Sequence, residues 1–209
     1  MTERSANPHR GLVLAGLLLA AGAGRRYGRP KALLDHGGKP LVDRTVEVLW
    51  AAGCRPVLVV VGAQADQVRA VAGRAGAQVV DNPDWPSGMA SSLRCGLAAL
   101  AGTAADAVAV LLVDMPGVGA GAVRRVAAGA DRRTLAAASY AGRQGHPVVL
   151  GRDHWPGAAA AATGDTGART YLRTHRRSLR LVPCADIADP TDLDRPVDRT
   201  GVDRLEVDP

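Results

Sequence analysis

Apolar runs alternate along the chain with segments whose apolar residues recur at helical spacing. Continuous apolar runs predict buried strands, and they cover residues 12–21, 56–61, 78–80, 107–113, 134–139, 147–150 and 179–182. The segments between them predict helices, at residues 40–49, 64–74, 88–100, 118–128 and 166–174. Such alternation is typical of an α/β protein with a mostly parallel, doubly wound sheet.

Length and composition predict a single domain. The 209 residues suffice for one α/β core and are few for two, and neither an internal repeat nor a low-complexity linker divides them. Hydrophobic residues make up 47% and charged residues 22%, as in globular proteins. We therefore expect a loose tail at residues 1–10 and one domain at residues 11–209.

The first apolar run also looks like a secretory signal, because Arg4, His9 and Arg10 precede it and small residues follow it. Cleavage there would destroy the glycine-rich loop described below, and the run is too short to span a bilayer. We interpret the run as the first buried strand and expect no association with a membrane.

The composition also argues against a nucleic-acid partner. The net charge is +6, but the basic residues are dispersed and aromatic residues make up only 3%, so few side chains could stack on bases. An anionic small substrate explains the positive balance equally well. Cys54, Cys95 and Cys184 show neither a disulfide framework nor zinc-ligand spacing, which fits a reducing cytoplasm, where we expect the protein.

The first strand stops at a glycine-rich turn, and the cations Arg25, Arg26, Arg29 and Lys31 follow at once. Glycines let the backbone approach a phosphate, and cations neutralise its oxygens. The last spacing between the glycines at positions 22, 24 and 28 is one residue longer than in the dinucleotide fingerprint G-x-G-x-x-G. The Gly-Lys-Ser/Thr of a Walker A loop is also absent from this segment. The sequence therefore favours a phosphate loop of another kind over a solvated basic hairpin.

Ligands of doubly wound sheets bind outside the carboxyl ends of the strands. Asp114 directly follows the strand at residues 107–113, where its carboxylate would hold Mg²⁺ or, in the alternative interpretation, cap the next helix. Asn82 follows the strand at residues 78–80, and Ser91 and Ser92 lie in the opening turn of the next helix. These serines would either meet a ligand or only cap the helix.

The loop resembles the signature of sugar-nucleotide-type nucleotidyltransferases, L-A-A/G-G-x-G-x-R-x-G-x-P-K. The matching positions are Leu19, Ala20, Ala21, Gly22, Gly24, Arg26, Gly28, Pro30 and Lys31. Later motifs resemble the MobA-like branch, and most closely its molybdenum cofactor cytidylyltransferases: Asn82-Pro83-x-Trp85-x-x-Gly88-x-x-x-Ser92-Leu93, Asp114-Met115-Pro116, Gly145-His146-Pro147, Gly164-Asp165-x-Gly167-Ala168-Arg169, and the tail Asp192-Leu193-Asp194-Arg195-Pro196-Val197-Asp198. The resemblance implies a three-layer, mostly parallel Rossmann-like nucleotidyltransferase sheet with helices on both faces.

The resemblance also implies a reaction, in which CMP passes from CTP to the terminal phosphate of the molybdenum cofactor (molybdopterin) and pyrophosphate leaves. It implies Mg²⁺ as cofactor and Arg26, Lys31 and Asp114 as catalytic residues. The nucleotide-binding positions it implies are Leu19, Ala20, Ala21, Gly22, Gly24, Arg26, Lys31, Asn82 and Ser92. Asp114 and Asp194 would hold the metal, and His146 and Asp165 would bind the acceptor.

The choice of CTP rests on Ala20-Ala21-Gly22, because guanylyl enzymes of the family read Ala-Gly-Gly there. Three other functions stay open: a GTP-using MobA-like transferase, an NAD(P)H-dependent oxidoreductase of the nicotine-blue type, and a non-catalytic nucleotide-binding module. The module would need a damaged lysine or metal position, but Lys31 and Asp114 are both present. A molybdenum hydroxylase apoenzyme is an expected partner.

Overall fold

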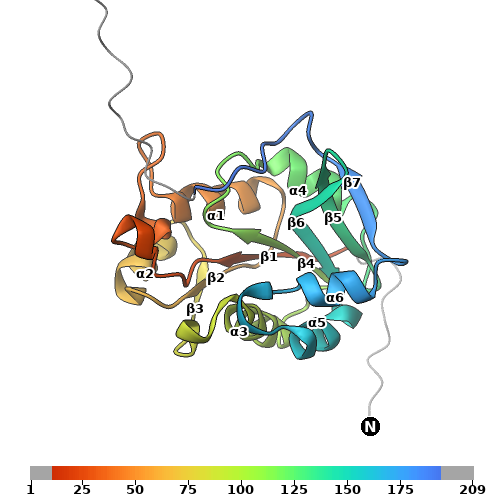
Figure 1. Ribbon diagram of the computed structural model, residues 1–209, viewed down its shortest axis with the longest axis horizontal. Helices are drawn as coiled ribbons and strands as arrows, with labels where there is room; N and C mark the ends of the chain where they lie inside the picture. The colour runs from red at the N-terminus through yellow and green to blue at the C-terminus, as the bar shows by residue number, and fades with distance from the viewer. Residues whose placement is uncertain (1–10, 194–209) are drawn as a thin grey trace, which may run out of the picture.

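The chain forms a seven-stranded sheet covered by helices on both faces (Figure 1). The computed structural model describes residues 11–193, apart from the side chain of Arg26. The strands follow the spatial order β3-β2-β1-β4-β6-β5-β7. They are β1 (Leu14–Leu19), β2 (Val57–Val61), β3 (Gln78–Asp81), β4 (Ala107–Leu112), β5 (Leu135–Tyr140), β6 (Arg143–Gly151) and β7 (Arg180–Pro183).

Three α-helices pack on each face of the sheet, which gives the three layers expected from the sequence (Figure 1). One face carries α1 (Leu41–Ala51), α2 (Ala65–Arg74) and α4 (Ala120–Ala127). The other carries α3 (Met89–Ala101), α5 (Trp155–Ala161) and α6 (Arg169–Thr174). Short 3₁₀ helices lie between them: η1 (Arg25–Tyr27), η2 (Lys31–Leu33), η3 (Trp85–Ser87), η4 (Arg152–His154) and η5 (Gly164–Thr166).

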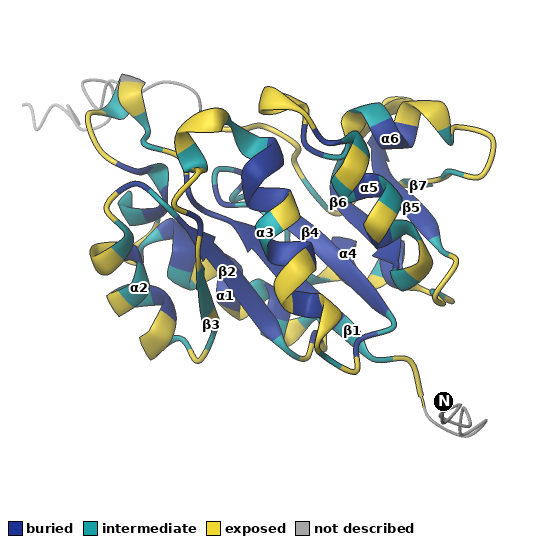
Figure 2. Cartoon of the chain, turned by 90° about the horizontal axis from the view of Figure 1, so that it is seen from below, coloured by how far each residue is buried: buried dark blue, intermediate teal, exposed yellow. Residues whose placement is uncertain are grey.

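The inner strands β1, β2, β4 and β5 and the second half of β6 are buried because alternate side chains enter two apolar clusters, one on either side of the sheet. The edge strands β3 and β7 stay partly exposed. In β1, Leu18 joins the cluster under α1, α2 and α4, whereas Leu17 and Leu19 join the cluster under α3, α5 and α6. Figure 2 shows the result: dark-blue strands lie between helices whose outer faces are exposed. The first apolar run is thus a central strand between β2 and β4, as we expected.

One strand runs against the other six. β1 pairs in parallel with β2 and β4, and β7 with β5, but β6 is antiparallel to both β4 and β5. The expectation of a mostly parallel sheet is therefore confirmed. The reversal has a consequence for the site, because the first residues of β6 lie at the edge where the parallel strands end.

Two predicted segments were wrong in their bounds, and one helix was not predicted. β6 begins at Arg143 rather than at residue 147, because a tight turn with positive φ at Ala141 and Gly142 joins it directly to β5. The helix expected from residue 166 begins at Arg169, because Gly167 with its φ of 51° interrupts the backbone. The sequence analysis also missed α5, whose alanine-rich segment carries no amphipathic pattern. No helix within residues 11–193 is long and apolar enough to cross a membrane.

The contact of α3 with β1 gives a test of the fold. A Cβ atom at Gly96 would collide with both Cδ methyl groups of Leu17, which is fully buried, whereas a Cβ atom at Gly73 in α2 would meet nothing within 4 Å. We expect Gly96→Ala to lower the free energy of unfolding by about 1–3 kcal/mol. Gly73→Ala, the matched control, should raise it by about 0.5–1 kcal/mol. Urea unfolding measures both, and an equal effect of the two changes would contradict this packing.

Candidate active site

The candidate site lies at the edge of the sheet where the parallel strands end. Ala20 and Ala21 follow β1, Gly62 follows β2, Asn82 follows β3, and Asp114 lies two residues beyond β4. Backbone hydrogen bonds tie the first two ends together, since Ala20 N–H donates to Val60 C=O and Ala63 N–H donates to Ala21 C=O, both at 3.0 Å. Two cavities open at this edge.

The smaller cavity, of about 380 Å³, follows the glycine-rich loop, and we call it the phosphate-loop cavity. Its volume is within the usual range of small-molecule sites. The lining residues are Leu19, Ala21, Gly22, Ala23, Gly24, Arg25, Lys31, Trp85, Pro86, Gly88, Met89, Ser92, Leu112, Val113, Asp114 and Asp165. The described lining includes two cations and two carboxylates, so its side chains can neutralise charge on a ligand.

Glycine at position 24 is required by the shape of the loop. Gly24 has a φ of 60°, and a side chain there would collide with the backbone carbonyl of Arg29. The chain therefore closes tightly on itself between β1 and η2, and this closure brings Lys31 back to the cavity. The side chain of Arg26, which we also expected at the phosphates, lies outside the described residues.

Lys31 and Asp114 form an ion pair in the wall of the phosphate-loop cavity. Lys31 Nζ donates to Asp114 Oδ2 at 2.8 Å, and the two side chains are only 18% and 22% exposed. A phosphate chain that reaches one of these groups therefore reaches the other. The alternative role of Asp114 as a helix cap is wrong, because α4 begins at Ala120 with Gly119 at its N-cap.

The segment beside Asp114 comes from the far end of the described chain. Leu193 N–H donates to the backbone C=O of Asp114 at 2.9 Å, and Asp189 N–H donates to Gly117 C=O at 3.1 Å. These bonds fix the loop that follows β4. Asp194, the second metal ligand implied by the resemblance, lies outside the described residues.

Asn82 is a buried anchor and does not line either cavity. Its amide nitrogen donates to Ser91 Oγ at 2.8 Å and to Ser92 Oγ at 3.0 Å, and its oxygen accepts from the N–H of Asp84 at 3.1 Å. Both amide hydrogens are thereby used within the protein. Of this group Ser92 lines the phosphate-loop cavity, so Asn82 holds Ser92 in position and does not itself reach the cavity.

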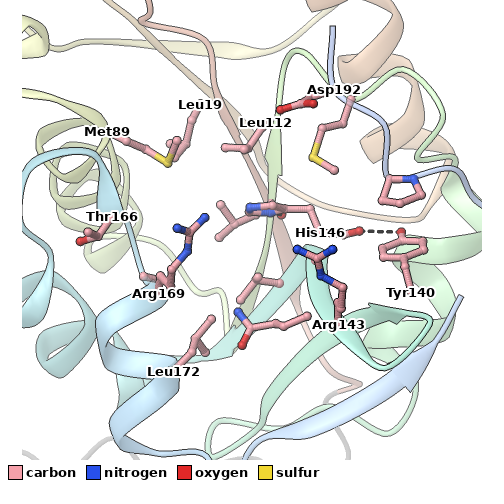
Figure 3. Close-up of a pocket in the computed structure, with 18 of the residues that line it drawn as sticks. Leu19, Met89, Leu112, Tyr140, Arg143, His146, Thr166, Arg169, Leu172 and Asp192 are labelled. Carbon is pink, nitrogen blue, oxygen red and sulfur yellow. Dashed lines mark hydrogen bonds between the residues drawn. The ribbon is translucent and has the colours of Figure 1, made fainter. Parts of the chain in front are cut away.

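The larger cavity, of about 920 Å³, surrounds His146, and we call it the His146 cavity. The guanidinium groups of Arg143 and Arg169 and the imidazole of His146 point into it (Figure 3). Arg143 and His146 belong to the first half of the reversed strand β6, and Arg169 opens α6. The carboxylates of Asp165, Asp189 and Asp192 line the same cavity, so it offers two guanidinium groups to an anionic part of a ligand and carboxylates to a hydrogen-bond-donating part.

His146 is held as a neutral imidazole with a defined tautomer. Its Nδ1 lies 3.2 Å from the C=O of Val110, which can only accept, so Nδ1 carries the proton and Nε2 keeps a lone pair. Removal from water lowers the pKa of His146 below its usual value. Burial also raises the pKa of Tyr140 to about 12, so its hydroxyl stays protonated and donates to His146 C=O at 2.7 Å.

Asp165 joins the two cavities. It lines both of them, as do Leu19, Met89 and Leu112. Its Oδ1 accepts a hydrogen bond from Met89 N–H at 3.3 Å, at the start of α3, where a carboxylate is favourable. The two cavities are therefore neighbours, with a carboxylate in the wall that they share.

The sequence analysis missed several residues of this cleft. Arg143 stands three residues before His146 and was passed over, because the strand was expected to begin later. Trp85 and Arg169 belong to the motifs that begin at Asn82 and Gly164, but the motifs alone did not indicate that these side chains line a cavity. Asp192 lines the His146 cavity (Figure 3), although the tail motif pointed to Asp194.

Comparison with known proteins assigns the chain to a family. The sequence profile of the MobA-like NTP transferase domain matches residues 16–179. The molybdenum cofactor guanylyltransferase of Rhodobacter capsulatus is 31% identical over 211 residues, covering 89% of this chain and 96% of that protein. The nicotine blue oxidoreductase of Paenarthrobacter nicotinovorans is 38% identical over 189 residues, covering 87% and 92%.

Solved structures share the fold of this chain. The crystal structure of Rv0371c from Mycobacterium tuberculosis H37Rv superposes with a TM-score of 0.75 at 28% identity, covering 88% of this chain and 94% of that chain. A complex of Rv0371c with manganese superposes with a TM-score of 0.69 at 27% identity, covering 82% and 88%. The profile match spans most of the chain, and two relatives exceed 30% identity along most of their length. The chain therefore belongs to the MobA-like NTP transferase family.

Proposed function

We propose that this protein transfers CMP from CTP to the terminal phosphate of molybdopterin and releases pyrophosphate. The observation that carries the proposal is the Lys31–Asp114 pair beside the glycine-rich loop, in a cavity that adjoins a second one lined by Arg143 and Arg169. The phosphate-loop cavity takes the nucleotide, and the His146 cavity takes the anionic acceptor. The name of the Rhodobacter capsulatus relative supports the same acceptor.

The reaction needs positioning and charge neutralisation more than a protein nucleophile. A phosphate oxygen of the acceptor attacks the α-phosphorus in line, the bond between the α-phosphorus and the bridging oxygen breaks, and pyrophosphate leaves with that oxygen. Arg26 and Lys31 hold the β- and γ-phosphates and the departing pyrophosphate. Arg143 and Arg169 hold the acceptor, whose hydrogen-bond donors meet Nε2 of His146.

The donor set of the cleft fits Mg²⁺. Asp114 offers a carboxylate oxygen beside the phosphate loop, and Mg²⁺ takes one or two carboxylates together with phosphate oxygens and water. Within residues 11–193 no group of three or more His, Cys, Asp or Glu could enclose a metal, and Asp194, the second ligand that the resemblance implies, lies outside that range; phosphate oxygens and water would supply the other ligands. When bound, the ion neutralises the charge of the phosphate chain. The manganese complex of Rv0371c supports a divalent ion.

The preference for CTP rests on Ala21, which lines the phosphate-loop cavity. Its methyl group takes space that a glycine would leave open to a purine. The relatives named guanylyltransferases make GTP the competing substrate. A molybdenum hydroxylase apoenzyme is the partner that would receive the product.

A second candidate is an oxidoreductase, favoured by the identity of 38% to nicotine blue oxidoreductase. The loop argues against it. A dinucleotide fingerprint opens directly into a helix whose N-terminus faces the pyrophosphate. Here β1 is followed by the three-residue helices η1 and η2 instead.

One experiment separates the candidates. Purified protein is incubated with molybdopterin, Mg²⁺ and each nucleoside triphosphate in turn, and pyrophosphate is measured. CTP should give the fastest release, and release should depend on the acceptor. A preference for GTP would make the protein a guanylyltransferase, whereas oxidation of NAD(P)H by nicotine blue without pyrophosphate release would establish the oxidoreductase.

Lys31→Ala should lower turnover by roughly 10²-fold, because a charge contact to the departing pyrophosphate is lost. Lys39→Ala is the matched control, since Lys39 is half exposed and pairs with Glu47 on the surface, where such pairs contribute little. Steady-state pyrophosphate release measures both, with circular dichroism to verify folding. Wild-type turnover in a folded Lys31→Ala protein would remove Lys31 from the mechanism.

Asp114→Asn should keep the fold but lose Mg²⁺-dependent CTP binding and nearly all pyrophosphate release. Asparagine preserves the shape and can still accept a hydrogen bond from Lys31, so the change removes chiefly the charge that holds the ion. Calorimetric titration with CTP, with and without Mg²⁺, measures the effect. Asp153→Asn, at an exposed aspartate outside both cavities, should behave as wild type; unchanged magnesium dependence in Asp114→Asn contradicts the metal role.

A further inference from the structure

Trp85 is the aromatic residue in the wall of the phosphate-loop cavity, and the proposed mechanism gives it no task. The chain has only three tryptophans, three tyrosines and no phenylalanine. Aromatic side chains are therefore rare in this protein, and one of them lies in the cavity wall. Trp85 is half-buried, packs against the cluster under α3 and still borders the cavity. Its side chain therefore has a packed part and a part that a ligand can touch.

Gly62 provides the place where the side chain of Trp85 sits. A Cβ atom at Gly62 would lie 2.6 Å from both Cβ and Cγ of Trp85 and 2.9 Å from Cβ of Ala21. All three distances are shorter than non-bonded contacts of real Cβ atoms. Gly62, Ala21 and Trp85 thus form one close-packed layer, and the absence of a side chain at Gly62 lets Trp85 lie this deep.

The backbone that carries Trp85 is held by its own hydrogen bonds. Trp85 N–H donates to Asn82 C=O at 3.2 Å, and Gly88 N–H donates to Trp85 C=O at 3.1 Å. Asn82 is in turn bound to Ser91 and Ser92 at the start of α3. The indole is therefore presented by a preorganised loop, which lowers the cost of ordering it on binding.

The chemistry of the lining indicates which part of a nucleotide meets Trp85. Arg25 and Lys31 line the cavity from the glycine-rich loop and suit phosphates, and Asp114 beside them would meet a phosphate chain through a divalent ion. Trp85 and Pro86 supply apolar surface from another segment of the chain. The base is the flat, aromatic part of a nucleotide, and aromatic side chains bind bases by stacking.

We propose that Trp85 is the contact surface for the nucleobase and that Gly62 sets how deeply the base can enter. The proposal rests on the proposed function in one respect, that a nucleotide occupies the phosphate-loop cavity. Gly62 is a positioning residue, because it acts through Trp85 and Ala21. Ala21 and Trp85 together form the wall that the base meets.

Tryptophan fluorescence tests the contact without any transfer reaction. CTP with Mg²⁺ and no acceptor should change the emission of the wild-type protein, and inorganic tripolyphosphate, which has no base, should bind without this change. Trp50→Phe is the matched control, since Trp50 lies on α1 and donates to Ala75 C=O, so the change on CTP binding should persist. Trp85→Phe should abolish it. A response that persists undiminished in Trp85→Phe overturns the proposal.

Binding affinities give the second arm. Trp85→Leu should weaken CTP binding roughly tenfold, the effect of losing one base stack, while tripolyphosphate binds within about twofold of wild type. Gly62→Ala should weaken CTP binding in the same selective way, because Trp85 must shift, and Gly73→Ala should not. Retained tripolyphosphate binding shows that each variant is folded. Equal losses for both ligands, or no loss for CTP, overturn the proposal.

These outcomes separate the proposal from the proposed function. Trp85-dependent CTP binding without pyrophosphate release in the full reaction would contradict the transferase alone. Cytidylyl transfer with base binding that ignores Trp85 would contradict the present inference alone. A protein that binds neither CTP nor GTP would overturn both.

Discussion

The contact between Lys31 and Asp114 is the constraint from which the cleft can be understood. The two residues are 83 positions apart in the sequence, yet Nζ and Oδ2 lie 2.8 Å from each other. They meet because β1 and β4 are adjacent parallel strands whose carboxyl ends reach the same edge of the sheet. The glycine-rich loop must then return to that edge within a few residues, and the steric demand at Gly24 shows how tightly it does so. The sheet topology, more than any local preference, places a cation and a carboxylate where a phosphate chain can meet both.

A strand of opposite direction, β6, brings the residues of the His146 cavity to the same edge. In β6 the pairing of Val148 with Val110 places His146, two residues earlier, beside the end of β4. A parallel strand would have sent His146 to the opposite edge, away from the phosphate loop. The reversal thus brings Arg143 and His146 to the cleft, and Asp165, which binds the start of α3, connects the two cavities. The transfer that we propose needs two ligands in contact, and one antiparallel strand places the His146 cavity where the second ligand would bind.

Much of this arrangement could be predicted from the sequence, and the reasons for the failures are physical. The inner strands were predictable because they bury both faces, and the loop was predictable because its glycines and cations form a local pattern. The hairpin of β5 and β6 was missed because Ala141 adopts a positive φ that an alanine rarely takes. The anchoring role of Asn82 could not be read from spacing, because it depends on two serines that approach in space. Residue types thus predicted which segments form the cleft, but not which polar side chains face it and which support it from beneath.

Glycine shapes this cleft by a different means at each position. A side chain at Gly24 would collide with the backbone carbonyl of Arg29. A side chain at Gly88 would collide with the carbonyl of Gly164, and one at Gly62 would collide with Trp85. The first closes the phosphate loop, the second lets η5 and Asp165 approach α3, and the third seats the aromatic wall. An alanine-rich core with few aromatic residues packs closely enough for such missing side chains to matter. The glycines at these three positions therefore set how closely the charged groups and the indole of Trp85 approach a ligand. For this reason we expect the selectivity of the cleft to depend on them as much as on the charged side chains.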